Sequence, residues 1–313
     1  MKKILITGAH GLLARHFIFN HKNNYQIIGT IHRVDDTETP DIELINIDFA
    51  TDWKTTDLPT NIDVVIHLAQ SSNYRDFPNS AEDIFKINVG STAMLLEYAR
   101  KAGAKTFIYA STGGLYGSGE QAFKEDSNIL PLNELNFHFS SKLSGEAIAQ
   151  PYSSLMNVII IRPFFIYGPG QRRSMLIPRL FDSIKAGKKI KIQGQNGIKI
   201  NPIHVNDAVP ALHKAVLLQE SNTFNFAGKD IFTIRQICEG IGEYLGIVPK
   251  FHHEEVSSED LIADISSMMK DLHIPTHNLL EHTGFHNRIF LLSYLLLRRT
   301  PCLCFDKNNK SNQ

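Results

Sequence analysis

The sequence contains little cysteine. Among 313 residues there are three, Cys238, Cys302 and Cys304. An odd number this small excludes the disulfide framework that holds small secreted domains together, and it fits a reducing compartment. We therefore expect the protein to be cytoplasmic.

An excess of charge of either sign is also absent. Lysine and arginine together number 32, and so do aspartate and glutamate. Without a net charge, no overall field attracts nucleic acid or an anionic membrane, although local patches remain possible. We expect no nucleic acid partner.

Apolar runs long enough to cross a membrane are missing as well. The first residues, MKKILITGAHGLLARHF, begin like a signal peptide, but Gly8, His10 and Arg15 interrupt the run and no small-residue cleavage site follows. We interpret them as a strand and a turn. Near the other end, RIFLLSYLLLRR is too short for a transmembrane helix. It belongs to an atypical tail, 286–313, which is either a packed terminal helix with a polar end or a segment resting on a membrane or partner surface.

Five short apolar runs rich in Ile and Val are present instead, and helical patterns alternate with them. The runs are KKILITGA, YQIIGTI, DVVIHLA, KTFIYAS and NVIIIRPFF. Between the third and fourth, DIFKINVGSTAMLLEYARKAG has apolar residues at helical spacing, and Gly103 is placed to end the helix. Continuous apolar runs are typical of strands buried on both faces. The alternation predicts an α/β fold with a Rossmann-type, doubly wound parallel sheet.

The pattern changes after Pro163. IPRLFDSIKAG predicts a helix, KIQGQNG a β-hairpin and TFNFAG a later strand. We interpret this part as a smaller C-terminal substrate lobe interleaved with the end of the sheet. The predicted Rossmann domain covers 1–165, with a returning segment at about 201–235. The predicted substrate-binding lobe covers 166–200 and 236–285.

A glycine-rich turn, LITGAHGLLA, directly follows the first strand. Gly8 allows a tight turn, Gly11 lets the backbone approach a pyrophosphate, and the N–H groups of the next helix face the anion. Ala14 is small enough for the helix to pack closely on the strand. The turn predicts a dinucleotide site, although glycine turns between a strand and a helix also occur without one.

The residue that recognises the adenosine ribose should follow the second strand. An acid there binds the 2′-hydroxyl of NAD, but GTIHR has Ile31 at that position and Arg33 just beyond. This favours NADP over NAD, with Arg33 binding the 2′-phosphate. The alternative is that Arg33 is a solvated loop charge.

Eight stretches, in order along the chain, together carry a resemblance to a known family. They are Thr7 to Ala14, Asp48, HLA at 67–69, NVGST at 88–92, STGGLYG from Ser111, HFSSK from His138, RPFFIYGPGQ from Arg162 and IHVND from Ile203. In them the chain resembles the extended short-chain dehydrogenase/reductase family, in its epimerase/dehydratase group. The resemblance implies NADP or NAD as cofactor, a nucleotide sugar as small-molecule substrate, and a homodimer paired through the two helices beside the active site.

The resemblance also implies site residues. Thr112 would hydrogen-bond the reacting oxygen and Lys142 would hold the nicotinamide ribose, while His138 stands where the family has its proton-carrying tyrosine. Cofactor contacts fall at Gly8, His10, Gly11, Leu12, Arg33, Asp48, Leu68, Ala69, Lys142 and Pro163, and substrate contacts at Thr112, Gly113, Phe165 and Tyr167. For Asp48 the alternative is an ordinary cap. Asn88 either holds backbone near the site or caps a helix.

His138 leaves two functions open. Imidazole titrates near pH 6.5, so it can act as a base at neutral pH without tuning. A nearby Lys142 ammonium and an oxidised nicotinamide disfavour imidazolium, and imidazole is shorter than phenol by roughly 2 Å. We therefore expect weak catalysis that favours alcohol oxidation over ketone reduction. The alternative is a catalytically impaired or noncatalytic NAD(P)-binding regulatory protein.

Other departures from the family concern the substrate. Ile200 holds the position of an arginine that binds the substrate diphosphate, and Phe165 replaces an asparagine. STGGLYG lacks the Asp-Glu pair of the sugar 4,6-dehydratases, which disfavours dehydration. The expected function is an NAD(P)-dependent epimerase, reductase or dehydrogenase that transfers hydride at a sugar carbon. No metal is expected, because His67 and His204 lie in apolar strand patterns and FHHEEVSSED lacks ligand spacing.

Overall fold

The computed structural model describes residues 1–32, 41–256 and 259–280. Arg33, which the sequence predicts as a cofactor contact, and the tail 286–313 lie outside the described residues. Within the ranges described, no helix is long and apolar enough to cross a membrane.

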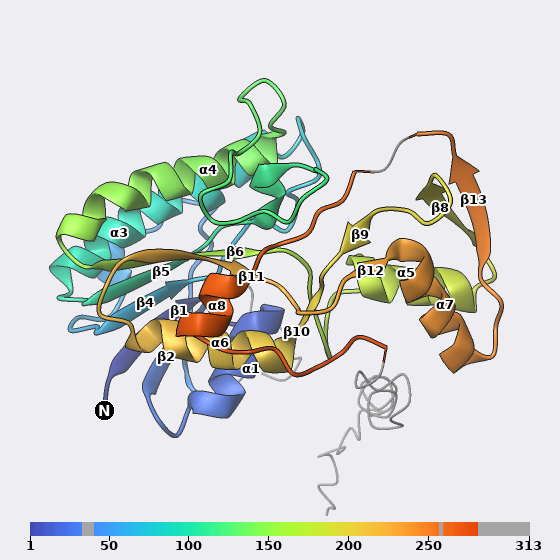
Figure 1. Cartoon of the computed structure of the whole chain (residues 1–313). Helices are drawn as coiled ribbons and strands as arrows, with labels where there is room; N and C mark the ends of the chain where they lie inside the picture. Colours follow the sequence, from blue (N-terminus) through green and yellow to red (C-terminus); the bar gives the residue numbers. More distant parts are fainter. Residues whose placement is uncertain (33–40, 257–258, 281–313) are drawn as a thin grey trace, which may run out of the picture.

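A seven-stranded sheet forms the larger lobe (Figure 1). Its strands lie in the order β11-β6-β5-β4-β1-β2-β3, and each neighbouring pair is parallel. Their bounds are β1 Lys3–Thr7, β2 Gln26–Ile31, β3 Glu43–Asn46, β4 Val64–His67, β5 Thr106–Ala110, β6 Asn157–Pro163 and β11 Asn222–Phe226. The strand order reverses between β1 and β4, as in doubly wound folds. The predicted Rossmann-type sheet is confirmed.

Helices cover both faces of the sheet, α1 with α6 on one and α3 with α4 on the other (Figure 1). Their bounds are α1 Leu12–His21, α3 Ser91–Lys101, α4 Phe137–Ala149 and α6 Val205–Leu217. Successive residues of a strand face opposite layers. In β1, Ile4 and Ile6 belong to the core under α1 and α6, whereas Leu5 belongs to the core under α3. Burial on both faces explains the continuous apolar runs.

Short helical segments connect the longer elements. Their bounds are η1 Thr55–Asp57, α2 Ala81–Phe85, η2 Lys86–Gly90, η3 Gly113–Tyr116 and η4 Gln150–Ser154. α2, the wide turn η2 and α3 follow one another without a break, which confirms the helix predicted between the third and fourth strands. It ends just before Gly103, whose φ of 83° is readily adopted by glycine alone.

A smaller lobe contains two helices and short strand pairs (Figure 1). The bounds are β7 Ile166–Tyr167, α5 Leu176–Lys185, β8 Lys189–Gln193, β9 Lys199–Ile200, β10 Ile203–His204, β12 Phe232–Thr233, α7 Ile234–Leu245 and β13 Lys250–Glu254. The hairpin predicted at KIQGQNG is wrong. A turn does form there, since Gly197 N–H donates to Gln193 O at 2.9 Å. However, β8 pairs with β13 and β9 with β12, and a local turn signal cannot reveal such distant partners.

The chain passes between the two lobes more than once. The strand predicted at TFNFAG forms as β11, and it lies in the sheet beside β6. Later, Ala263, Ile265 and Met268 pack into the core under α1 and α6, and α8 (Ser266–Asp271) lies next to β11. This return falls inside 236–285, a range predicted to belong to the substrate lobe. The boundaries of the two domains remain a prediction.

Candidate active site

The C-terminal ends of β1, β4 and β5 meet at the edge of the sheet that faces the smaller lobe (Figure 1). The strand order reverses at this point, between β1 and β4. In open α/β sheets the ligand crevice forms at such a reversal. The stretches around Gly8, Ala69 and Thr112 directly follow these three strands. The predicted motifs therefore come together at one edge.

The glycine-rich turn forms a cradle beside the loop after β4. Gly8 has a φ of 71°, and a Cβ there would lie 3.1 Å from Cα of Ala69, so both conformation and space require glycine. Gly11 N–H donates to Gly8 O at 2.7 Å, and Gly11 has no side chain to cap α1. The N–H groups of the first helical turn are left for an anion such as a pyrophosphate. The residues present fit a dinucleotide.

Thr7, at the end of β1, fixes the loop after β4. Its hydroxyl accepts from the N–H groups of Leu68 at 3.1 Å and Ala69 at 3.0 Å, and it hydrogen-bonds Nδ1 of His67 at 2.8 Å. Nε2 of His67 lies 3.0 Å from the Thr92 hydroxyl. Burial lowers the pKa of His67 to about 3. His67 is a satisfied core residue, as predicted.

The other predicted cofactor contacts lie at or just after the ends of β1, β3 and β6 in the chain. His10 and Leu12 belong to the turn and the first helical position, and Pro163 ends β6. Asp48 follows β3, and its Oδ1 accepts from Ala50 N–H at 2.9 Å, so this carboxylate caps a turn. Contact of these residues with a dinucleotide remains a prediction.

Thr112, His138 and Lys142 lie together where β5 meets the start of α4. The side chain of Asn136 caps α4 by accepting from Phe139 N–H at 2.9 Å. His138 and Lys142 are one turn apart in this helix. Lys142 is 1% exposed, and its Nζ donates to Ala110 O at 2.7 Å, two residues before Thr112. This contact joins α4 to the end of β5, and a common catalytic role for the three residues remains a prediction.

Gly114 allows the loop with Thr112 to lie against α4. Thr112 Oγ1 accepts from Gly114 N–H at 3.1 Å. A Cβ at Gly114 would lie 2.4 Å from the ring of Phe139, the neighbour of His138. A larger residue at this position would move the loop away from the helix.

A buried ion pair adjoins Lys142. Burial lowers the pKa of Lys142 to about 7, and the Glu146 carboxylate acts in the opposite direction. Arg162 binds both carboxylate oxygens of Glu146, with Nε at 2.9 Å and Nη2 at 2.7 Å, and donates to the Tyr116 hydroxyl at 2.6 Å. We did not predict this pair from the sequence. The signal that could have indicated it is Glu146, which stands one helical turn after Lys142.

His138 is a neutral imidazole at physiological pH. Burial lowers its pKa to about 3, and the charges of Lys142 and Arg75 act in the same direction. Its Nδ1 is buried and has no hydrogen-bond partner among the described residues. The ring packs against that of Tyr74, with centroids 4.7 Å apart. The expected neutrality of His138 thus has burial as its main cause, with repulsion from Lys142 second.

Asn88 connects the loop after β4 to α4. Its Oδ1 accepts from Ser71 N–H at 3.1 Å, and its Nδ2 donates to Ser141 Oγ at 2.9 Å. Ser141 Oγ in turn donates to His138 O at 2.7 Å. Of the two alternatives for Asn88, the structure agrees with the holding of backbone near the site. The Ser71 and Ser141 partners could not be read from the sequence.

The predicted substrate contacts are less closely grouped. Gly113 is buried next to Thr112, and Phe165 is half-buried, with its carbonyl accepting from Ile203 N–H at 2.9 Å. Tyr167 is 2% exposed and belongs to the core of the smaller lobe, and its contact with a substrate remains a prediction. Ile200 is fully buried in the same core. Its side chain offers no charge to a diphosphate.

The positive charge beside Ile200 is already paired. Lys199 Nζ lies 2.9 Å from Asp260 Oδ2, and the Lys199 N–H also donates to Asp260 at 2.8 Å. The expectation that Lys199 points away from the Ile200 face agrees with their burial, since Lys199 is exposed and Ile200 is not. This part of the lobe therefore has little to attract a diphosphate.

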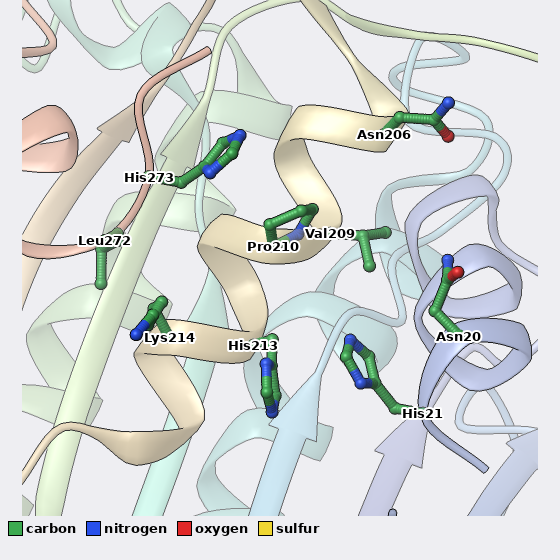
Figure 2. A pocket seen from close by; sticks show the side chains of 9 residues that line it. All are labelled: Asn20, His21, Asn206, Val209, Pro210, His213, Lys214, Leu272 and His273. Carbon is green, nitrogen blue, oxygen red and sulfur yellow. The ribbon is translucent and has the colours of Figure 1, made fainter. Parts of the chain in front are cut away.

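A hollow of about 460 Å³ lies between α1, α6 and the segment at Leu272. Figure 2 shows His21 and His213 side by side at its wall, with His273 beyond α6. The first two rings stack at 4.1 Å, and burial is the main cause that lowers the pKa of each. None of the predicted site residues that the structure describes lines this hollow, so it is separate from the candidate active site.

Histidines are frequent, but no metal centre is formed within the described ranges. No group of three or more His, Cys, Asp or Glu side chains there could hold a metal ion. His204 caps α6, its Nδ1 accepting from Asn206 N–H at 3.2 Å, and it stacks on His277 at 4.8 Å. His204 is 5% exposed and satisfied, as predicted for a core residue.

Comparison with protein families gives one match over most of the chain. Residues 4–227 match the model of the NAD dependent epimerase/dehydratase family. An uncharacterized UDP-glucose epimerase of Bacillus subtilis is 27% identical over 323 aligned positions, which cover 94% of this chain and 98% of that protein. GDP-6-deoxy-D-talose 4-dehydrogenase of Aggregatibacter actinomycetemcomitans is 24% identical, covering 86% and 88%.

Solved structures with the same fold include two nucleotide-sugar epimerases. UDP-glucuronic acid 4-epimerase from Bacillus cereus, in complex with NAD, has a TM-score of 0.80 at 24% identity and covers 93% of this chain and 99% of its own. UDP-N-acetylglucosamine 4-epimerase from Methanobrevibacter ruminantium has a TM-score of 0.81 at 20% identity, covering 94% and 99%. At these identities the likeness establishes the fold alone.

Proposed function

The chain belongs to the NAD dependent epimerase/dehydratase family, and we propose that it is an NAD(P)-dependent epimerase, reductase or dehydrogenase that acts on a nucleotide sugar. The observation that carries this proposal is the grouping of Thr112, His138 and Lys142 beside the dinucleotide cradle. The relatives named above are epimerases and a dehydrogenase of nucleotide sugars. The alternative of a noncatalytic regulatory protein is not favoured.

The proposed role of each side chain in the reaction follows from its chemistry. When bound, a nicotinamide dinucleotide supplies hydride exchange with the carbon that bears the reacting hydroxyl. Nδ1 of His138, which has no partner among the described residues, accepts the proton of that hydroxyl, and Thr112 hydrogen-bonds the same oxygen. Lys142 holds the ribose of the cofactor. Because His138 is neutral near physiological pH, it has no imidazolium proton to donate to a ketone, and oxidation is favoured over reduction.

Turnover of the purified protein tests this function. The rate of nicotinamide reduction or oxidation is followed with UDP-glucose, UDP-glucuronic acid and GDP- and dTDP-linked sugars, and product epimers are separated by chromatography. Oxidation faster than reduction near neutral pH is the expected result. Dinucleotide binding without turnover of any of these sugars contradicts the enzymatic proposal.

We infer further that NADP is preferred to NAD. Ile31, at the end of β2, is an apolar core residue and offers no carboxylate to a ribose 2′-hydroxyl. Arg33 is the candidate for the 2′-phosphate. Fluorescence titration should give a lower Kd for NADPH than for NADH, and Arg33→Ala should raise the first Kd and leave the second unchanged. Equal affinities for both cofactors contradict the preference.

We also propose a cytoplasmic homodimer paired through α3 and α4. Phe85 of α2 and Met94 of α3 are exposed apolar side chains on this side of the molecule, and burial in a dimer would remove them from water. Light scattering after gel filtration measures the mass. A mass twice that of the chain is expected, and Met94→Glu should halve it.

A further inference from the structure

An aromatic side chain from another part of the chain covers His138. The ring of Tyr74, in the loop after β4, has its centroid 4.7 Å from that of His138 at an interplanar angle of 42°. The guanidinium of Arg75 lies 5.1 Å from the centroid of the Tyr74 ring. The helix position that holds a tyrosine in the family thus has a phenol beside it, contributed by a different loop.

Two further contacts hold this loop against α4. Asn88 bridges Ser71 of the loop and Ser141 of the helix. The rings of Phe77 and Phe137 stack with centroids 4.9 Å apart, at 20°. The position of Tyr74 next to His138 is therefore fixed from both ends of the loop.

The hydroxyl of Tyr74 points toward the smaller lobe and has a weak partner there. It donates to Sδ of Met175, just before α5, at 3.9 Å. A thioether is a poor acceptor, so a sugar oxygen in its place would form a stronger hydrogen bond. Next to it, Nδ1 of His138 is buried and without a partner in the described part of the chain. Buried polar atoms seldom lack a partner, and a catalytic role is one of the explanations for those that do.

We propose that Tyr74 is a substrate-contacting residue of the active site, whose hydroxyl leaves Met175 and donates a hydrogen bond to a sugar oxygen beside His138. This inference rests on the proposed function. Tyr74 provides an O–H donor and His138 an Nδ1 acceptor, and a hydroxyl-bearing sugar carbon can satisfy both. Tyr74 thereby returns a phenol to a site whose helix lacks one.

Tyr74→Phe tests the contact, because it keeps the ring on His138 and removes the hydroxyl. Isothermal titration with UDP-glucose and UDP-glucuronic acid, in the presence of NADP, measures binding. We expect the sugar Kd to rise about tenfold, with the dinucleotide Kd and Tm unchanged. Tyr152→Phe, in η4 after the end of α4, is the matched control and should bind as the wild type does.

A second variant tests the placement of Tyr74 without any ligand. Tyr74→Ala exposes His138 to water, and NMR titration should show the pKa of His138 rising from about 3 toward 6.5, although Lys142 and Arg75 remain nearby. An unchanged His138 titration contradicts the inference. Wild-type binding of a sugar with equal binding by Tyr74→Phe also contradicts it, whereas a wild type that binds neither of these two sugars nor any GDP- or dTDP-linked sugar contradicts the proposed function itself.

Discussion

Arg162 donates hydrogen bonds to both carboxylate oxygens of Glu146, at 2.9 and 2.7 Å. Glu146 lies one helical turn beyond Lys142. All three residues are less than one tenth exposed. The Glu146 carboxylate stays ionised in this pair, and its negative charge raises the pKa of Lys142 that burial lowers. The charge on Lys142 near neutral pH therefore depends on Glu146, which is itself bound by Arg162.

Glu146→Gln should affect both charge and stability. Without the carboxylate the pKa of Lys142 falls below about 7. Lys142 then loses its proton at a lower pH, so the alkaline limb of the activity profile should shift to lower pH. The variant also leaves Arg162 buried and unpaired, which costs about 3–5 kcal/mol of the free energy of unfolding. Urea denaturation and the pH profile of kcat/KM measure these effects. Glu239→Gln, in an exposed pair on α7, is the control, and an unmoved pH profile in Glu146→Gln contradicts the coupling.

Lys142→Met should separate activity from stability. Removal of a buried ammonium in favour of an apolar chain of similar length should leave Tm unchanged or higher. Loss of the group proposed to hold the cofactor ribose should lower kcat/KM by about 100-fold or more. Thermal denaturation and turnover are measured together, with Lys185→Met on the exposed side of α5 as the control. A variant that keeps its activity contradicts the role of Lys142.

Asn88→Ala should loosen the loop that bears Tyr74. Ser71 N–H and Ser141 lose a buried partner, which costs about 1–3 kcal/mol of the free energy of unfolding. Because the loop then moves relative to His138, the sugar Kd should rise as well. Urea denaturation gives the first effect and calorimetry the second. An unchanged sugar Kd in a destabilised protein would limit Asn88 to a structural role.

Stability should fall in acid because three histidines are buried in neutral form. The pKa values of His67 and His138 are lowered to about 3 and that of His204 to about 4, chiefly by burial. In the unfolded chain they titrate near 6.5, so between pH 6.5 and those values the unfolded state binds more protons. Each histidine then contributes a loss of up to about 1.4 kcal/mol per pH unit as the pH falls.

Denaturation at a series of pH values checks this dependence. Stability from these groups is complete above pH 6.5 and is lost progressively toward pH 3. His138→Phe should flatten the curve, whereas His252→Asn, at an exposed position, should leave its slope unchanged. A wild-type free energy of unfolding that stays constant between pH 6.5 and 4 would rule out buried neutral histidines.

The sheet could be predicted because its signals are local. Strands such as Val64–His67 are continuous apolar runs, and Gly8 marks the turn after the first strand by its own chemistry. The spacing of His138 and Lys142 likewise indicated a shared helix face. These features depend on residues close together in the chain.

The remaining features depend on contacts between distant segments. The pairing of β8 with β13 and the packing of Met268 under α6 have no local pattern. Tyr74 lies 64 positions before His138 in the sequence, in a loop without strand or helix periodicity, and only folding places the two rings together. The buried Glu146–Arg162 pair was missed for the same reason.

The most direct test of the account is single-turnover oxidation of a nucleotide sugar by the wild type, His138→Ala and His138→Tyr, followed by nicotinamide absorbance with NADP in excess. We predict that the wild type turns over slowly and that His138→Ala loses about 100-fold or more of the rate, since Nδ1 of His138, which has no partner among the described residues, is the proposed proton acceptor. Activity confined to His138→Tyr would contradict the claim and would show that the site binds its ligands without a proton acceptor of its own.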